Sequence, residues 1–326
     1  MSGVTLVIPN RDGAAYLPDC LDAVAALRPG PDETVVVDDA SADDSMALLR
    51  ARYPWVRVLA SGPDGRPQGF ARTCNVGIAA AAADHDIALL NNDTRIEPGW
   101  LGALADALGH QPGAASVASR MLQKDGAHVN ACGLLLGGDG TCRALGDGTP
   151  DGPRFDRACE VFGASGGAAL WRRAALDALG GFDETFFAYY EDADLAWRAR
   201  AAGWTAVYAP AARVIHTEGR CPSLRRIDKV RLRIRNGLWF AWSCLPAGVL
   251  VRRFPRIAWA TGWRYFFKYG LRPWKVEGRA FWLAIAEVKF HPVAFWRRRC
   301  ARQAGRTVPA GALVRWMGRD PFAEAD

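Results

Sequence analysis

The feature that most constrains the fold of this chain is the order of short apolar runs and amphipathic segments in its first hundred residues. Val4–Ile8, Thr34–Val37 and Ile87–Leu90 are short and aliphatic, which is typical of buried parallel strands. The segment Ala14–Leu27 between the first two carries leucines and a valine at helical spacing. This β-α-β-α order predicts an α/β fold with an open, mostly parallel sheet flanked by helices. A ligand site is then expected beyond the carboxyl ends of the strands.

Further elements follow from the same two patterns. Gly203 follows the last predicted helix of this region and is typical of a helix C-terminus. Residues 120–160 are rich in Gly and Asp and give no clear element, whereas residues from about 225 onward have a helical pattern. We expect helices at Ser45–Arg52, Phe70–Ala82, Pro98–Leu108, Arg172–Leu179 and Glu191–Ala202, and strands at Val56–Leu59, Trp204–Tyr208 and Ala212–His216.

The cysteines and the first residues of the chain bear on its cellular compartment. Eight cysteines are scattered without a Cys-x-x-Cys pair, which favours reduced and mostly buried thiols over a zinc site or a disulfide framework. The segment Met1–Pro9 lacks the basic flank and the long apolar stretch of a signal peptide and is expected to be the first strand. The sequence therefore predicts a cytoplasmic protein.

Charge divides the chain into two parts. Residues 1–220 hold 19 Lys and Arg against 28 Asp and Glu, whereas residues 221–326 hold 22 against 6. Eight of the 13 tryptophans also lie in the second part. We therefore predict a catalytic domain at 1–220 and a basic, Trp-rich helical extension at 221–326, with different partners.

Carboxylates stand directly after two of the predicted strands. Asp38 and Asp39 follow Thr34–Val37, and Asp93 follows Ile87–Leu90 after two asparagines. Because the carboxyl ends of parallel strands meet at one edge of a sheet, these side chains are expected in one crevice. Asp39 could instead serve only as a helix cap. Two carboxylates at equivalent strand ends favour a ligand-binding role.

Five blocks of sequence carry a family resemblance. They are VIPNRDG (7–13), VVVDDAS (35–41), GFARTCNVGI (69–78), LLNNDTRIEPGWL (89–101) and GGFDETFFAYYEDADLAWRARAAGW (180–204). In this order they resemble the inverting glycosyltransferase family 2, and most closely its rhamnosyltransferase-like branch, over about residues 4–218. The resemblance implies the GT-A nucleotide-diphospho-sugar transferase fold and transfer of a sugar from a nucleoside diphosphate to an acceptor hydroxyl.

The resemblance also implies where the donor nucleotide binds. Asp38 or Asp39 would accept a hydrogen bond from the base, which a carboxylate can do from a pyrimidine imide N–H. Asn91 and Asn92 occupy the positions where the family often carries the first two residues of an Asp-x-Asp motif, and Asn91 would face the ribose. The other expected nucleotide-binding residues are Pro9, Asn10, Arg72 and Asn75.

A divalent cation is implied at Asp93, the last residue of the same motif, with His216 completing its site. Oxygen and imidazole ligands suit Mn²⁺ and tolerate Mg²⁺. Because Asn92 is neutral, it cannot supply a second anionic ligand. The alternative for His216 is a core histidine with satisfied hydrogen bonds.

Catalysis is expected at Glu191 and Asp192. Inverting transfer needs a base for the acceptor proton, and Asp192 is the candidate, with Glu191 orienting it or binding the acceptor. The alternative is that both acids only favour the helix dipole, as we expect for Asp194, which can pair with Arg198 one turn later. The small residues of Gly163–Gly167 predict either a close approach to the diphosphate or a plain turn.

The C-terminal extension leaves several partners open. The apolar run Gly237–Val251 would span about 22 Å as a helix and contains Pro246, so it is too short to cross a bilayer. Aromatic and basic residues then alternate from Trp259 to Arg299, which suits a membrane surface, packing onto the catalytic domain, or a homodimer contact. No nucleic-acid-binding motif is present, so nucleic acid is not an expected partner.

The predicted substrates are a dTDP- or UDP-sugar donor, with rhamnose as the first candidate sugar, and a saccharide or lipid-linked acceptor used in cell-surface polysaccharide or glycolipid synthesis. A lipid-linked acceptor would place the protein on the cytoplasmic face of the inner membrane. The alternative function is a catalytically decayed nucleotide-sugar-binding or scaffold protein. A nicotinamide dehydrogenase is disfavoured because no G-x-G-x-x-G follows the first strand.

Overall fold

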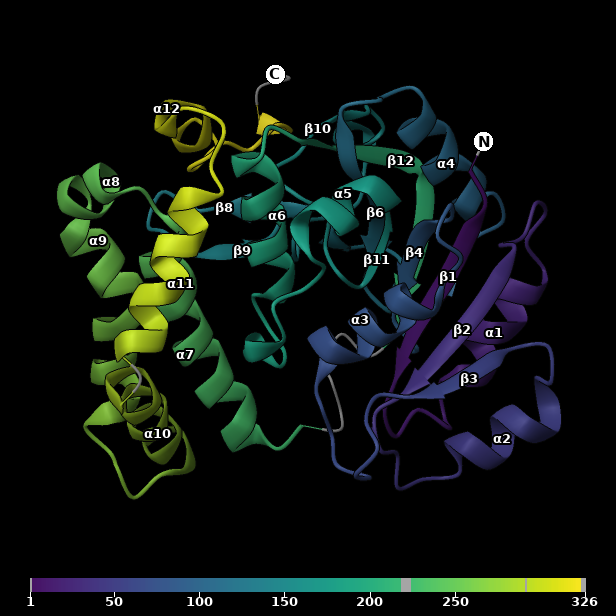
Figure 1. Ribbon diagram of the computed structural model, residues 1–326, viewed down its shortest axis with the longest axis horizontal. Coiled ribbons are helices and arrows are strands. Elements are labelled where there is room, and N and C mark those ends of the chain that lie inside the picture. The colour runs from purple at the N-terminus through teal and green to yellow at the C-terminus, as the bar shows by residue number, and fades with distance from the viewer. Residues whose placement is uncertain (1, 218–223, 291, 324–326) are drawn as a thin grey trace.

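The computed structural model describes residues 2–217, 224–290 and 292–323. Its centre is a mixed sheet in which strands follow one another in the order β10-β12-β6-β11-β4-β1-β2-β3, with β5 and β7 at its margins (Figure 1). Strands β4, β1, β2 and β3 are parallel neighbours, and β11 runs antiparallel between β4 and β6. The strands are β1 (Val4–Asn10), β2 (Glu33–Asp38), β3 (Arg57–Ala60), β4 (Asp86–Leu90), β5 (Thr94–Ile96), β6 (Ala114–Leu122), β7 (Val129–Ala131), β10 (Cys159–Glu160), β11 (Ala168–Trp171) and β12 (Thr205–His216). Strands β8 (Leu134–Leu136) and β9 (Cys142–Ala144) pair separately.

Alternate residues of the central strands face two different helical layers. Val35 and Val37 pack in the same apolar cluster as α3 (Phe70–Ala80), α5 (Arg173–Leu179) and α6 (Glu191–Ala201). Val36 between them packs with α1 (Leu17–Ala25), α2 (Ser45–Arg52) and α4 (Trp100–Gly109). Since helices cover both faces of the sheet there, β1, β2 and β4 are buried along almost their whole length and lack the side-chain alternation of a half-exposed strand.

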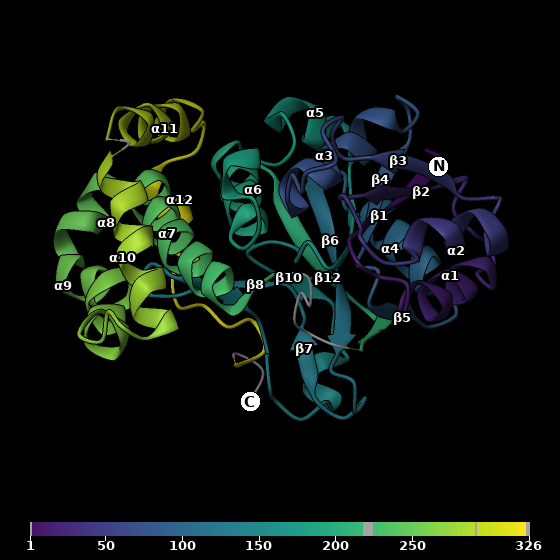
Figure 2. The same ribbon diagram turned by 90° about the horizontal axis from the view of Figure 1, so that it is seen from below.

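The C-terminal helices gather on one side of the molecule, with α6 between them and the sheet in both ribbon views (Figures 1 and 2). They share an apolar cluster with α6 in which Trp197 packs with Phe240, Leu245 and Trp316. Several residues in this region form π-helical turns. The elements are α7 (Arg226–Cys244), α8 (Ala247–Arg252), α9 (Phe254–Ala258), the π-helical turns η3 (Trp259–Trp263) and η4 (Phe266–Gly270), α10 (Val276–Phe290), α11 (Pro292–Ala304) and α12 (Ala310–Val314).

A buried ion-pair network fixes the extension to α6. Asp194 is fully buried, and its carboxylate accepts from Arg198 at 2.8 Å within the helix and from Nε of Arg302 on α11 at 2.7 Å. The predicted pairing of Asp194 with Arg198 is therefore confirmed. Removing this carboxylate would leave Arg198 without an anionic partner among the described residues, whereas Arg302 would keep Asp183 at 2.6 Å.

The predicted elements are present, with corrected boundaries. The expected helix Ala14–Leu27 begins only at Leu17, and the expected helix Pro98–Leu108 begins at Trp100 because Gly99 adopts φ +84° before it. Two expected strands are one, β12, whose register shifts between Ala209 and Arg213. Residues 120–160, without a clear pattern, contain the end of β6 and all of β7 to β10.

The cysteines and the apolar run Gly237–Val251 agree with the sequence-based expectations. The seven described cysteines are all free thiols, four of them buried, whereas Cys221 lies outside the described residues. Helix α7 ends at Cys244 and α8 begins at Ala247, so the helix is interrupted at Pro246, as expected. None of the described helices combines the length and the apolar character needed to cross a bilayer.

Candidate active site

A cavity of about 300 Å³ opens beyond the carboxyl ends of β1, β2 and β4. Residues far apart in the sequence line it. They come from the ends of these strands, from the start of α3, from the loop before β11, from the segment before α6 and from the end of β12. The expected site residues that line it are Pro9, Asn10, Asp39, Asn91, Asn92, Asp93, Glu191, Asp192 and His216. The predicted crevice at the strand ends is therefore present.

The two aspartates after β2 have different positions. Asp39 lines the cavity, and its carboxylate accepts from Ser61 Oγ at 2.6 Å and from the N–H groups of Gln68 and Gly69. Asp38 does not line the cavity. Its carboxylate accepts from Asn10 Nδ2 at 2.9 Å and from Ser41. Asp39 is therefore the one of the pair that a nucleotide in this cavity could reach.

Asn92 is tied to Asn10 across the floor of the cavity. Its Nδ2 donates to Asn10 Oδ1 at 2.7 Å, while Asn10 Nδ2 donates to Asp38. An aspartate at position 92 would set a carboxylate against the carbonyl oxygen of Asn10, which is an electrostatic conflict. The hydrogen bond to Asn10 therefore explains why position 92 carries a neutral asparagine in place of an aspartate.

His216 and Asp93 face each other within the cavity. Nε2 of His216 lies 3.0 Å from Oδ1 of Asp93, and Nδ1 lies 3.1 Å from Oδ1 of Asn130 on β7. Because the Nδ1–H group donates a hydrogen bond to Oδ1 of Asn130, the imidazole ring is oriented with Nε2 toward the carboxylate of Asp93. There it either donates as an imidazolium or shares a cation with Asp93.

The chemistry of this pair fits a divalent cation. Asp93 is only 6% exposed, so its carboxylate needs a positive partner, and a carboxylate plus an imidazole suits Mn²⁺. The described residues hold no cluster of three or more His, Cys, Asp or Glu side chains able to bind a metal. Any cation at this pair would therefore also need ligands from the substrate or from water.

The acids at the start of α6 also line the cavity. Asp192 Oδ2 accepts from the N–H of Gly166 at 3.2 Å, and Oδ1 accepts from the N–H of Ala193 at 2.8 Å. Burial raises the pKa of Asp192 above the ordinary aspartate value. Burial, together with the charge of Asp192, raises the pKa of Glu191 to about 8. Glu191 Oε2 is buried without a hydrogen-bond partner among the described residues, so this carboxyl is poised to meet a ligand.

The backbone before these acids is strained. Phe187, Tyr189 and Tyr190 all have positive φ angles, which side-chain-bearing residues rarely adopt. Phe187 packs so closely on Gly69 that a Cβ added to that glycine would lie 2.6 Å from the ring, and Gly69 itself has φ +89°. Strain of this kind persists only where the surroundings hold it in place.

Helix α7 of the extension holds this segment. Asn236 is fully buried, and its Nδ2 lies 2.7–2.9 Å from the carbonyl oxygens of Phe186, Ala188 and Tyr189. Arg235 Nη2 donates to the carbonyl oxygen of Phe186 at 3.0 Å. The extension thus fixes the wall of the cavity from which α6 begins.

The family follows from a comparison with known proteins. Residues 2–236 match the family described as "Glycosyltransferase like family 2". The chain belongs to glycosyltransferase family 2. Its mixed sheet with flanking helices is the GT-A fold, and its activity is that of a glycosyltransferase.

Relatives of this glycosyltransferase include a sequence from Mycobacterium tuberculosis (strain ATCC 25618 / H37Rv), the N-acetylglucosaminyl-diphospho-decaprenol L-rhamnosyltransferase. It is 31% identical over 224 residues, which are 62% of this chain and 71% of the relative. The similarity agrees with the rhamnosyltransferase-like branch indicated by the five sequence blocks.

Solved structures share the fold at low sequence identity. S. aureus TarS 1-349 in complex with UDP-GlcNAc has a TM-score of 0.57 at 15% identity, with 93% of this chain and 89% of that one covered. GalNAc-T7 with UDP, GalNAc and Mn²⁺ has a TM-score of 0.56 at 15% identity over 79% of this chain. This glycosyltransferase spans only 56% of the GalNAc-T7 chain.

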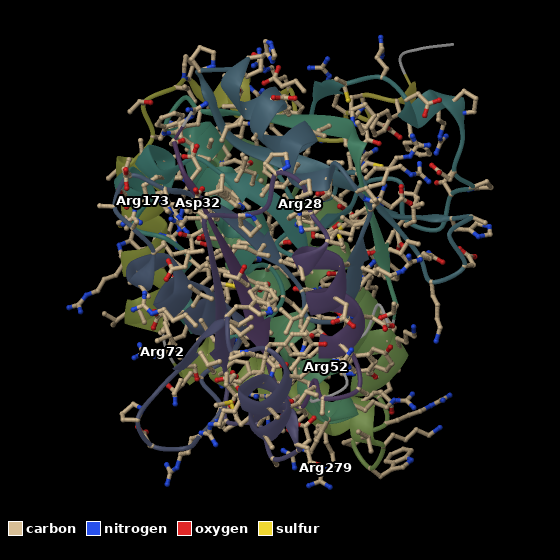
Figure 3. All side chains as sticks on the ribbon, turned by 90° about the vertical axis from the view of Figure 1, so that its right-hand side faces the viewer. Arg28, Asp32, Arg52, Arg72, Arg173 and Arg279 are labelled. Carbon is tan, nitrogen blue, oxygen red and sulfur yellow. The ribbon has the colours of Figure 1, made fainter. Side chains whose placement is uncertain are left out.

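Two expected nucleotide-binding residues of the glycosyltransferase lie outside the cavity lining. Arg72 pairs with Glu184 at 2.9 Å and is 41% exposed; Figure 3 shows it at the margin of the molecule. Asn75 exchanges hydrogen bonds with the backbone of Phe182 at 2.9 Å in both directions. Both side chains fasten α3 to the segment before α6, and their role in nucleotide binding stays a prediction.

Several lining residues were not anticipated from sequence. Asn130 on β7 orients His216, and Arg11, Phe70 and Met121 also face the cavity. Asn130 lies in the region without a clear pattern, so no periodicity pointed to it. Of the expected glycine-rich segment, Ser165, Gly166 and Gly167 line the cavity, which supports a close approach of substrate over a plain turn.

Proposed function

We propose that this protein is an inverting glycosyltransferase that moves a sugar from a nucleoside diphosphate to an acceptor hydroxyl. The observation that carries the proposal is that Asp192, Asp93 and His216 line one cavity. An acid–base group and a cation-binding pair are the two parts that direct displacement at C1 requires. No covalent nucleophile is needed for this chemistry.

Asp192 is the proposed base. Two backbone N–H groups fix its carboxylate, so the oxygen that takes the acceptor proton has a set orientation. Its raised pKa brings its basicity closer to the working pH, which favours proton transfer. Glu191 is the proposed acceptor-binding neighbour because its unpartnered oxygen can accept from or donate to a hydroxyl.

Asp93 and His216 are the proposed ligands of a divalent cation, Mn²⁺ or Mg²⁺. When bound there, the cation supplies a Lewis acid that stabilises the charge of the departing diphosphate. Asn130 orients the imidazole for this task. Asp39, Asn10, Pro9 and Asn91 are the proposed contacts of the nucleoside.

The proposed donor is a dTDP- or UDP-sugar, with rhamnose as the candidate sugar, and the proposed acceptor is a lipid-linked saccharide. Both follow from similarity to the mycobacterial L-rhamnosyltransferase, whose name specifies a diphospho-decaprenol acceptor. The product would belong to cell-surface polysaccharide or glycolipid synthesis.

We also propose contact with the cytoplasmic surface of a membrane through the segment 259–279. Of the large apolar side chains exposed in the described part of the chain, all except Trp55 lie between Val251 and Trp296. Within this segment Trp263, Phe267 and Trp274 are more than half exposed, and exposed bases alternate with them while Glu277 is its one acid. Aromatic rings with interleaved Lys and Arg suit an anionic headgroup layer. A homodimer contact is the alternative use of this surface.

The decisive experiment measures donor binding and turnover together. Purified protein is incubated with a panel of nucleoside diphosphate sugars, with and without Mn²⁺, and is assayed for thermal stabilisation and for release of the nucleoside diphosphate with a sugar-diphospho-prenyl acceptor. We expect one donor to stabilise the protein and to turn over with an inverted anomeric configuration. Stabilisation by a donor without any turnover would instead support the decayed binding protein, and a retained configuration would contradict the proposed base.

A further inference from the structure

A second cavity, of about 430 Å³, adjoins the active site. Arg11, Phe187 and Leu224 line both cavities, so the two share a wall or an opening. The second cavity lies over the first turns of α7.

Guanidinium groups dominate the lining of this cavity. Of its described lining residues, Arg11, Arg225, Arg231 and Arg235 are basic and one, Asp228, is acidic.

Two acids pair with the three arginines of α7 and its cap. Asp228 pairs with Arg225 at 2.9 Å and with Arg231 at 3.5 Å. Glu287 of α10 pairs with Arg231 and, at 2.9 Å, with Arg235. Two carboxylates therefore serve three guanidinium groups of α7 and its cap, and Arg11 adds a fourth positive charge. With Asp12 beside Arg11, four guanidinium groups meet three carboxylates, and the described groups leave an excess of one positive charge, which favours an anion.

Arg11 adds a second, independent observation. Its Nε is buried and has no hydrogen-bond partner among the described residues, and its one ion pair, with Asp12, is 3.8 Å long. A buried donor without an acceptor costs free energy unless a ligand supplies one. Arg11 stands at the boundary of the two cavities, so that ligand can reach from one into the other.

We propose that this cavity binds the diphosphate of the acceptor; the inference rests on the proposed glycosyl transfer. The donor diphosphate already has a proposed partner in the cation at Asp93 and His216, which leaves the arginines for the other phosphate-bearing substrate. An acceptor whose hydroxyl meets Asp192 and whose diphosphate lies one sugar away would occupy both cavities at once. Arginine is suited to this task because its planar fork binds phosphate oxygens in pairs.

The test compares Arg225→Gln and Arg231→Gln with the control Arg226→Gln. Arg226 is adjacent, has the same charge and pairs with Glu277, but does not line the cavity. Each protein is assayed with a prenyl-diphospho-sugar acceptor and with the same sugar as a neutral alkyl glycoside. We expect the KM for the diphospho acceptor to rise roughly 10-fold in the two cavity variants, as for loss of a charge-assisted hydrogen bond. The KM for the donor and for the alkyl glycoside should stay unchanged.

A second experiment measures pyrophosphate binding directly and does not depend on turnover. Inorganic pyrophosphate is titrated into the full chain in EDTA by calorimetry, and the heat should disappear in Arg225→Gln and Arg231→Gln and persist in Arg226→Gln. Absence of pyrophosphate binding to the unaltered protein, or a higher KM for the donor alone, overturns the diphosphate site. Failure of the unaltered protein to release nucleoside diphosphate with any acceptor overturns the proposed function instead, so the two failures are distinguishable.

Discussion

Nε2 of His216 lies 3.0 Å from Oδ1 of Asp93, although the two residues are 123 positions apart in the chain. The pairing of β12 with β5 brings them together, since His216 stands opposite Thr94 in the register of these strands. The last residue of β12 is thereby placed beside Asp93, the residue directly before β5. The ends of two neighbouring strands thus bring a carboxylate and an imidazole together.

Replacement of His216 tests the proposed cation site. We expect His216→Gln to lower Mn²⁺-dependent turnover at least about 10-fold and to weaken stabilisation by Mn²⁺. Asn130→Ala should have a smaller effect of the same kind, because the imidazole loses its orienting partner. EDTA should abolish turnover, and added Mn²⁺ should restore it. The exposed His110 provides the control His110→Gln. Full turnover of His216→Gln in EDTA would contradict the cation site.

Replacement of Asp192 tests the proposed base. Asp192→Asn keeps the size of the side chain and removes its basicity, so kcat should fall roughly 10²- to 10⁴-fold. Thermal stabilisation by the donor should remain, because the donor contacts are proposed on other residues. Asp177→Asn, an exposed acid of α5, is the matched control. A variant of Asp192 that keeps most of its rate would exclude this residue as the base.

Glu191 gives a pH dependence of stability. Its folded-state pKa of about 8 exceeds the ordinary 4.5, so between these values the folded protein holds a proton that the unfolded chain releases. The free energy of unfolding therefore falls as the pH rises through this window. Glu191→Gln carries no such charge and should raise the Tm by at least about 2 °C more at pH 9 than at pH 5.

Thermal denaturation of Glu191→Gln across this pH range checks the expectation. The control is Asp106→Asn, which removes an exposed acid from α4. An equal shift of Tm at both pH values would mean that Glu191 does not bury a titrating charge.

Much of the active site could be predicted because its residues follow strands with strong local patterns. Asp39 stands directly after β2, and Asp93 follows β4 after two asparagines; the strand-helix order alone places such residues at one edge of a sheet. The sequence pattern also predicted that Glu191 and Asp192 lie at the start of a helix, which is α6. These are local signals, and the tertiary structure only brings them together.

Other parts could not be predicted because tertiary contacts decide them. Asn130 lies on a three-residue strand, too short for any periodicity. Asn236 is a polar residue inside a helix, where local sequence favours a solvent-exposed position, yet it is fully buried against backbone carbonyls. The register shift in β12 interrupts its strand pattern, so the sequence predicted two strands where the structure has one. Each of these features depends on a partner far away in the chain.

Asn236 tests whether the C-terminal extension positions the active site. In Asn236→Leu the carbonyl oxygens of the segment before α6 lose their shared donor, and the strained backbone there should relax. We expect kcat to fall roughly 10-fold with little change in donor affinity, since Asp39 and Asp93 are not in this segment. Ser243→Ala, a buried residue of the same helix that bonds only within the extension, is the control. Equal losses in both variants would indicate general destabilisation of α7, which Tm measurements would show.

The segment 259–279 provides the last prediction, on membrane contact. The protein should sediment with vesicles that contain anionic phospholipid at low salt and remain in solution with purely zwitterionic vesicles, because exposed bases accompany the aromatic rings. Trp263→Ser combined with Trp274→Ser should reduce binding roughly 10-fold or more, since both rings are more than 60% exposed and contribute apolar area to the interface. Trp55→Ser, which replaces an exposed tryptophan between α2 and β3, should bind as the unaltered protein does. If the double variant binds vesicles normally but changes the oligomeric state in sedimentation velocity, this segment is a contact between copies of the chain, and the membrane proposal is wrong.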